Sequence, residues 1–278
     1  MKNKIFYLLF FISTATFITH YLDIDDKALF YLSHDEKNNI IDKNSYIYKT
    51  KTIDSIKKNL SGVTYNENSD TLFVITNSPK MVYELDKNGD LLRTIKLDGF
   101  SDTEDLTHIK DELFAIVDER LSSIVVVLVP QEATTIYKNE HIKKFKLDVK
   151  IFENFGLEGI SYDKDKDKFY VVNERSPKKI LTIQGLLSGS DIKVKHHDEL
   201  LDQNSFLSDL SAIHFDEQSK NIYLLSEESS LLARVDDGKN FNKYLSIPLE
   251  YPEGITKDLD GNFYIVSEPN IFLSITHE

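Results

Sequence analysis

The sequence predicts an all-β fold, a five-bladed β-propeller whose last blade is closed by a strand from the N-terminal side. Three observations predict it: a pattern that occurs five times, the spacing of its copies, and a last copy that is one strand short. Long helices are not indicated, because no long segment after the N-terminal apolar stretch keeps a 3.6-residue apolar period.

Each copy of the pattern is a short polar start, an apolar strand, a polar turn and a second apolar strand. In the first copy, Ser61-Gly62-Val63 leads to Leu72-Phe73-Val74-Ile75. The starts are 43, 54, 53 and 42 residues apart and fall at Ser61, Glu104, Glu158, Ser211 and Glu253. A four-stranded propeller blade has a period of about 40–50 residues. The first two strands of each blade are expected to be nearly all apolar, because they would be buried on both faces between neighbouring blades.

The two ends of the repeat region complement one another. After Glu253 only three strands are indicated, at 254–257, 263–267 and 271–276. The missing strand is predicted at Tyr46–Ile53, before the first copy, where it would close the ring and remove the exposed edges. A sixth, degenerate blade within 124–152 or 181–207 is the alternative count. With five blades, these inserts predict extra loops or a short helix, for instance near 185–187.

The N-terminal residues differ from the rest of the chain. Lys2 and Lys4 precede an apolar stretch from Ile5 to Ile18, which is typical of an export signal or a signal-anchor. We therefore expect a signal-anchor or signal peptide over 1–22, a connector over 23–44 and the β-propeller domain over 45–278. No small-x-small cleavage site follows, which favours the anchor; a buried N-terminal helix or strand is the alternative.

Composition excludes several classes of function. Asp and Glu total 46 against 33 Lys and Arg, a formal charge of -13 with no local basic stripe, so nucleic-acid binding is not expected. The chain has no cysteine, which rules out zinc–thiolate sites, a cysteine nucleophile and disulfides. The turn Asp163-Lys164-Asp165-Lys166-Asp167 resembles the start of an EF-hand loop but lacks its later Gly and Glu, and it is predicted to be a solvated hairpin turn. His214, on a first strand, is predicted to be a core histidine.

Aligning the five copies produces two polar columns. The first column consists of the polar residues that begin the copies, Ser61, Glu104, Glu158, Ser211 and Glu253. The second column consists of the residues at the ends of the second strands, Asn77, Asp118, Glu174, Glu227 and Glu268. Within a blade the two members are 14 to 16 residues apart, a spacing that returns an antiparallel hairpin to its starting level. Both columns are therefore predicted at one mouth of the central channel. Seven of the ten residues are carboxylates, and such crowding raises pKa values unless cations or arginines offset it.

Three interpretations of this ring remain open at the level of sequence. A divalent cation, calcium above all, is one, because calcium takes six to eight oxygen ligands in flexible geometry; its predicted ligands are Glu104, Glu158, Glu174, Glu227, Glu253 and Glu268. A second is that the carboxylates hydrogen-bond the next blade and lock the ring. A third is a catalytic site near Glu174. Arg120 and Arg175, each beside a second-column residue, are predicted to pair with the ring or to hold an anion.

The chain resembles the SdiA-regulated family over roughly 46–276. The resemblance is carried by the segments Asn59-Leu60-Ser61-Gly62-Val63, Leu157-Glu158-Gly159-Ile160, Val172-Asn173-Glu174-Arg175-Ser176-Pro177, Asp209-Leu210-Ser211-Ala212-Ile213 and Pro252-Glu253-Gly254-Ile255. It implies a membrane-associated, extracytoplasmic propeller of Gram-negative bacteria, with a link to calcium responses and some likeness to phytase-type propellers. Two copies depart from the pattern, because Ala212 and Asp105 stand where the others have glycine.

The expected function is that of a non-enzymatic propeller that binds calcium at the channel mouth and acts in envelope sensing or scaffolding. It is expected at the inner membrane, held by the N-terminal segment, with the propeller facing the periplasm and an envelope protein as a possible partner. The alternatives are a metal-dependent hydrolase, phytase-like or lactonase-like, and a metal-free protein-interaction platform.

Overall fold

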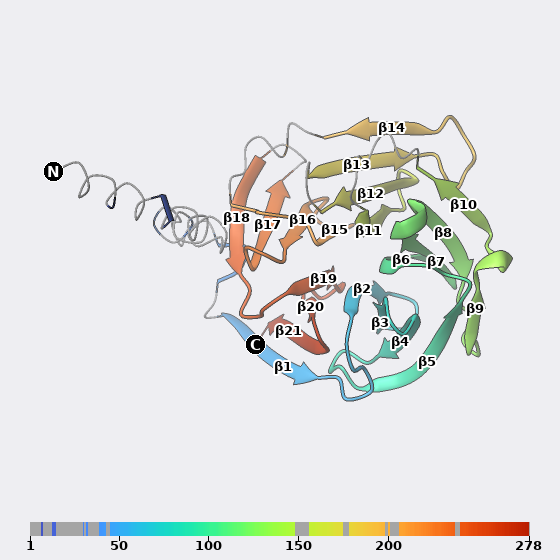
Figure 1. Cartoon of the computed structure of the whole chain (residues 1–278), viewed down its shortest axis with the longest axis horizontal. Helices are drawn as coiled ribbons and strands as arrows, with labels where there is room; N and C mark the ends of the chain where they lie inside the picture. The colour runs from blue at the N-terminus through green and yellow to red at the C-terminus, as the bar shows by residue number, and fades with distance from the viewer. Residues whose placement is uncertain are drawn as a thin grey trace.

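The computed structural model describes residues 39–42, 45–147, 156–174, 178–197, 206–236 and 240–277, together with Tyr7, Ser13, Thr14, Phe30, Leu32 and Leu200. Five antiparallel sheets are arranged radially around a central channel (Figure 1). The predicted all-β, five-bladed propeller is confirmed, and the six-bladed alternative is wrong.

Each blade contains four antiparallel strands, counted from the channel outward. Blade 1 consists of β2 (Leu60–Asn66), β3 (Thr71–Thr76), β4 (Met81–Leu85) and β5 (Leu91–Asp98). Blade 2 consists of β6 (Thr103–Lys110), β7 (Leu113–Asp118), β8 (Ser123–Leu128) and β10 (Lys143–Lys146). Blade 3 consists of β11 (Leu157–Asp163), β12 (Lys168–Asn173), β13 (Lys179–Gln184) and β14 (Lys193–His196). Blade 4 consists of β15 (Ala212–Phe215), β16 (Ile222–Ser226), β17 (Leu231–Asp236) and β18 (Asn240–Ser246).

Blade 5 joins the two ends of the propeller. Its inner strands are β19 (Pro252–Lys257), β20 (Phe263–Ser267) and β21 (Ile271–His277), and its outer strand is β1 (Tyr46–Thr52). β1 pairs antiparallel with β21 in continuous register from Tyr46 opposite His277 to Thr52 opposite Ile271. The predicted closing strand is therefore confirmed.

The long inserts form no further blade. The first contributes β9 (Thr135–Tyr137) and the 3₁₀ helix η4 (Lys138–Glu140) between β8 and β10. β9 pairs in parallel with β5 and so adds a fifth strand to blade 1. A second 3₁₀ helix, η3 (Glu119–Leu121), follows β7. Near 185–187, where a short helix was one expectation, the chain forms a turn in which the Gly189 N–H donates to the Gly185 carbonyl.

The core is divided among the contacts between blades. Five separate clusters of buried apolar side chains are found, and each receives one inner-strand residue from the set Val63, Leu106, Ile160, Ile213 and Ile255. These five side chains are at most 3% exposed. Burial on both faces explains why the second strands of the blades, β3, β7, β12, β16 and β20, are almost continuously apolar.

Part of the predicted connector packs on blade 4. Phe30 is buried, with its ring centroid 5.5 Å from that of Phe206 and 5.7 Å from that of Tyr244. The Ile40 N–H donates to the Tyr244 carbonyl, and Ile41 is buried beside it. Most of the predicted signal-anchor or signal peptide lies outside the described residues, so the domain boundaries remain predictions. Among the described residues, no helix has the length and apolar character needed to cross a bilayer.

Candidate functional site: an acidic channel mouth

The starts of the inner strands are distorted in a way that repeats. In blades 1, 2, 3 and 5 the register between the first two strands shifts by one residue, and each shift contains the first-column residue. Such a β-bulge inserts one unpaired residue and re-aims its side chain. In blade 4, Ser211 directly precedes β15, and its N–H donates to the Leu225 carbonyl. The bulges direct the polar starts toward the channel mouth.

The residue after the first column governs how closely the blades approach. A Cβ on Gly254 would lie 2.8 Å from the Val63 nitrogen and 2.9 Å from the Gly62 Cα, so only glycine fits without a shift. In blade 2 this position is Asp105, which is 5% exposed. Its carboxylate accepts the N–H groups of Leu106 and Ile160, each at 2.8 Å. Asp105, which replaces the glycine of the other copies, thus forms a hydrogen bond that links blade 2 to blade 3.

The two polar columns meet as predicted, with one exception. They line a single cavity of about 170 Å³ at one end of the channel, whose walls are Asn59, Ser61, Asn77, Glu104, Glu158, Glu174, Ser211, Glu227, Glu253 and Glu268. All six glutamates predicted as metal ligands are among them.

Asp118 is the exception, and its predicted place at the mouth is wrong. Its side chain is fully buried and forms an ion pair with Lys138 of η4. Its carboxylate also accepts the N–H groups of Ser101 at 3.0 Å and Asp102 at 3.3 Å. The Lys138 ammonium, supplied by the long insert, draws this carboxylate away from the channel.

Three carboxylates that the columns did not contain lie at or near the mouth. Asp102 and Glu119 place carboxylate oxygens within 4.8 Å of one another and of Glu104. Asp209 forms a similar group with Glu174 and Glu227. Asp209 is also a structural acceptor, because it takes hydrogen bonds from the Ser226 hydroxyl and the Glu228 N–H. The only sequence signal for these residues was their position one or two places from the columns.

The two predicted arginines have different outcomes. Arg120 donates through Nη2 to Asp102 Oδ2 at 3.1 Å, with a largely exposed side chain. It therefore pairs with the outer edge of the acidic mouth. Arg175 lies outside the described residues.

Burial and mutual repulsion change the protonation of the mouth. Desolvation, followed by repulsion from Glu119 and Asp102, raises the pKa of Glu104 to about 8. Desolvation and the charges of Glu227 and Glu268 raise the pKa of Glu253 to about 9. Burial also raises the pKa of Glu158 well above its usual value. Part of the mouth is therefore protonated at neutral pH.

Hydrogen bonding differs among these three glutamates. Glu104 accepts from Asn77 Nδ2 at 2.8 Å and from the Ser61 hydroxyl at 3.3 Å, which links blade 2 to blade 1. Within the described part of the chain, the carboxylates of Glu158 and Glu253 have no hydrogen bond or ion pair. One glutamate thus fits the ring-locking interpretation, and two do not.

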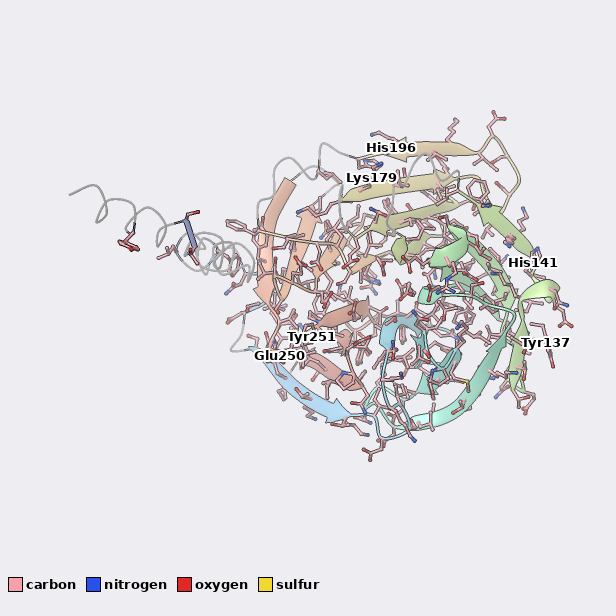
Figure 2. The ribbon with its side chains drawn as sticks, in the orientation of Figure 1. Tyr137, His141, Lys179, His196, Glu250 and Tyr251 are labelled. Atoms are coloured by element: carbon pink, nitrogen blue, oxygen red, sulfur yellow. The ribbon has the colours of Figure 1, made fainter. Side chains whose placement is uncertain are left out.

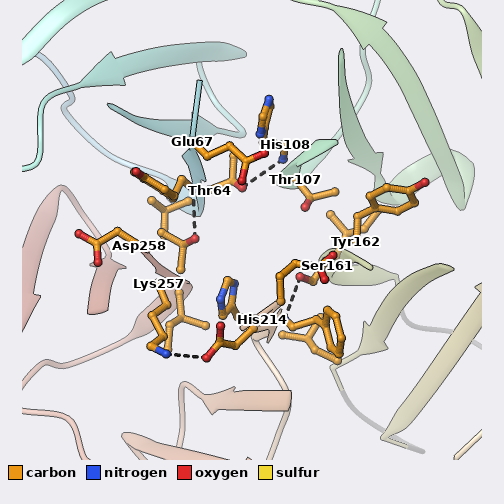
Figure 3. Close-up of a pocket in the computed structure, with 18 of the residues that line it drawn as sticks. Thr64, Glu67, Thr107, His108, Ser161, Tyr162, His214, Lys257 and Asp258 are labelled. Atoms are coloured by element: carbon orange, nitrogen blue, oxygen red, sulfur yellow. Dashed lines mark hydrogen bonds and ion pairs between the residues drawn. The ribbon is translucent and has the colours of Figure 1, made fainter. Parts of the chain in front are cut away.

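The opposite mouth has a different electrostatic character. Three of its carboxylates are paired between blades: Glu67 with Lys164, Asp165 with Lys220 at 2.6 Å, and Asp216 with Lys257 at 2.5 Å. Figure 3 shows this pocket, with Lys257 paired beside His214. Burial lowers the pKa of His214 to about 4, so its imidazole is neutral. The turn at 163–167 joins β11 to β12, as predicted, but it is only partly solvated because Asp163 is fully buried.

Fold and site together define the class of this molecule: a five-bladed propeller with an acidic cavity at one mouth of its channel. The sequence model of the SdiA-regulated family matches residues 37–276. The chain belongs to the SdiA-regulated family.

Solved structures with similar architecture include three propeller-like proteins. A luciferin-regenerating enzyme aligns with a TM-score of 0.55 and 9% identity, over 83% of this chain and 95% of its own. Regucalcin of Agrobacterium tumefaciens, described as a calcium-binding protein, aligns with a TM-score of 0.54 and 14% identity, over 83% and 94%. A gluconolactonase of Xanthomonas campestris aligns with a TM-score of 0.53 and 11% identity, over 83% and 90%. Identities this low show a common fold and nothing finer.

Proposed function

We propose that this protein is a non-enzymatic propeller of the cell envelope that binds a divalent cation, calcium, in the acidic channel mouth and acts in sensing or scaffolding. One observation carries the proposal. Glu158 and Glu253, both half-buried, line a shared cavity without a hydrogen-bond or ion-pair partner among the described residues. Burying carboxylates in this way is costly unless a positive charge offsets it.

The donor set fits calcium. The cavity offers carboxylate oxygens, the side-chain oxygens of Asn59 and Asn77, and the hydroxyls of Ser61 and Ser211. Calcium accepts six to eight oxygens of mixed type in irregular geometry, whereas magnesium requires a near-ideal octahedron and keeps several waters. The regucalcin likeness shows that a similar fold occurs in a protein described as calcium-binding, and it supplies no ligand correspondence. Ligands from several blades would make ion binding stabilise the ring as a whole.

The proposed location is the inner membrane, with the propeller in the periplasm. It rests on Lys2, Lys4 and the apolar stretch from Ile5 to Ile18. Because the chain has no cysteine, one introduced at the exposed position of Leu259 is a unique label. Labelling by a membrane-impermeant maleimide in intact spheroplasts is expected, and labelling only after lysis would contradict this placement.

A metal-dependent hydrolase is the second candidate, and it is favoured by the raised pKa values. A carboxyl such as Glu253, with a pKa of about 9, is protonated at neutral pH and suits a general acid next to a bound cation. The proposal of a non-enzymatic protein predicts no turnover of phosphoesters or lactones by the calcium-loaded chain. Turnover that disappears in Glu253→Gln would replace it with the hydrolase.

Thermal unfolding tests cation binding directly. We expect calcium, and not magnesium, at about 100 times its dissociation constant to raise the Tm of the metal-stripped full chain by about 5–10 °C. The double variant Glu158→Gln/Glu253→Gln removes the two unpartnered carboxylates and should lose this shift. The matched control is Glu112→Gln/Glu132→Gln, which makes the same two substitutions at exposed positions away from the mouth.

The outcomes separate the candidates. A calcium shift that survives in Glu158→Gln/Glu253→Gln would mean that the ion binds elsewhere. An equal loss in the control would mean that calcium only screens the net charge. If neither ion shifts the Tm, the metal-free protein-interaction platform is the candidate that remains. In that case the mouth carboxylates would lock the ring, as Glu104 does through its hydrogen bonds to blade 1.

A further inference from the structure

The long insert of blade 2 carries a buried charge, that of Lys138. β9 is aligned along blade 1, with Lys96 opposite Thr135 and Asp98 opposite Tyr137. Tyr137 and His141, which bracket η4, lie at the periphery of the propeller (Figure 2). Lys138 between them is instead 8% exposed, and its ammonium lies 5.4 Å from the centre of the Phe100 ring. The insert thus places one lysine side chain, that of Lys138, in the interior of the propeller.

The acceptor of this lysine organises the loop that carries two mouth carboxylates. Asp118 forms an ion pair with the Lys138 ammonium. Its two carboxylate oxygens also accept hydrogen bonds from the N–H groups of Ser101 and Asp102. The Glu119 N–H in turn donates to the Asp102 carbonyl at 2.8 Å. These bonds hold the backbone at Asp102 and at Glu119 in one arrangement, beside Glu104.

We propose that Lys138 is a positioning residue of the cation site: through Asp118 it holds Asp102 and Glu119 next to Glu104 and so builds the blade 2 side of the site. This inference rests on the proposed function. It assigns a role to an insert that no other blade has among the described residues. Outer groups that orient ligands are known to change metal affinity without touching the ion.

The two carboxylate groups at the mouth differ in which residue accepts the nearby hydrogen bonds. In the group with Glu174 and Glu227, Asp209 must itself accept from Ser226 and Glu228. In the group with Glu104, the N–H groups of Ser101 and Asp102 are instead accepted by Asp118, which is not a member of the group.

Calorimetric titration of the full chain with calcium chloride tests the role of Lys138. We expect Lys138→Met to bind calcium about 10-fold more weakly. Lys144→Met is the matched control, because Lys144 lies exposed on β10 of the same insert, and it should bind as the wild type does. Since Lys138→Met leaves Asp118 buried without its cation, the double variant Asp118→Asn/Lys138→Met, which buries no unpaired charge, is measured as well and should also be weakened.

A second readout needs no calcium. Hydrogen exchange at the Ser101 and Asp102 amides should become about 10-fold faster in Lys138→Met than in Lys144→Met, since exchange reports local opening. A folded double variant with wild-type calcium affinity, or unchanged exchange at both amides, would overturn the inference. If the wild type binds no calcium, the proposed function fails, and the exchange measurement alone decides whether Lys138 positions this loop.

Discussion

At the channel mouth, each carboxylate makes its neighbours harder to ionise. Glu104, Glu158 and Glu253 sit in one cavity, and for all three burial is the first cause of the raised pKa, followed by the charges of other mouth carboxylates. Such groups remain protonated in the folded chain at pH values where the unfolded chain has already released the protons. Protons and a cation are therefore alternative ways of neutralising the same cavity.

This competition predicts a pH dependence of stability. The folded pKa values of about 8 for Glu104 and about 9 for Glu253 lie above the ordinary value of 4.5. The folded state binds more protons than the unfolded state between these limits, so the contribution of these groups to stability is complete below about pH 4.5 and is lost as the pH rises toward 9. Without metal, the Tm should fall from pH 6 to pH 9.

Glu253→Gln mimics the protonated side chain and should flatten that decline, whereas Glu112→Gln should leave it unchanged. Saturating calcium should restore the wild-type Tm at pH 9 more than at pH 6. A metal-free wild type whose Tm rises steadily from pH 6 to pH 9 would show that these carboxyls are not protonated in the folded state.

The site could be predicted from sequence only where it follows the repeat. All six predicted glutamates line the cavity, because hairpin spacing determines which ends of the strands meet. Asp118 was misplaced because its partner, Lys138, comes from an irregular insert that no repeat alignment registers. Asp102, Glu119 and Asp209 were missed for the same reason: they lie in connections, where spacing carries no information about position.

At the scale of the element, the β-bulge and the residue after it act together. The bulge turns a first-column side chain into the mouth, and the following glycine lets the next inner strand approach to contact. The sequence indicated the pairing of Glu with Gly but not the bulge, because a bulge is a register shift between two strands and leaves no composition signal of its own.

A Gly254→Ala substitution tests this arrangement. The new Cβ would meet backbone atoms of Gly62 and Val63, which cannot rotate away, so we expect a loss of about 1–3 kcal/mol in the free energy of unfolding. The reciprocal control is Ala212→Gly in blade 4, where a Cβ is already accommodated; it should cost at most about 1 kcal/mol. Denaturant unfolding measures both, and equal losses would mean that close approach is not what glycine provides.

At the scale of the whole molecule, the two faces of the ring differ in whether their carboxylates are paired with lysines. On the face away from the acidic mouth, ion pairs such as Asp165 with Lys220 and Asp216 with Lys257 connect successive blades. At the mouth, Glu158 and Glu253 have no such partner among the described residues. The proposed function depends on this difference, because carboxylates without a lysine or arginine partner are the ones that an external cation would neutralise.

Closure of the ring is the property on which both faces depend, and β1 is its test. A chain that begins at residue 54 lacks β1 and exposes the edge of β21, whose buried residues include Phe272, Leu273 and Ile275. An exposed apolar edge strand pairs with other chains. We therefore expect this truncation to aggregate or to unfold without cooperativity, as judged by size-exclusion chromatography and thermal unfolding.

The control truncation begins at Asn39, which retains β1 and the contacts of Ile40 and Ile41 with blade 4 while removing the apolar N-terminal segment. It should remain monomeric with a single transition, so that loss of β1 and loss of that segment are distinguished. A synthetic peptide of residues 46–53 should partly restore the shorter chain, because strand pairing alone recreates the missing edge. A monomeric, cooperatively folding chain without β1 would show that the propeller holds its ring through the blade interfaces, and that the closing strand serves another purpose.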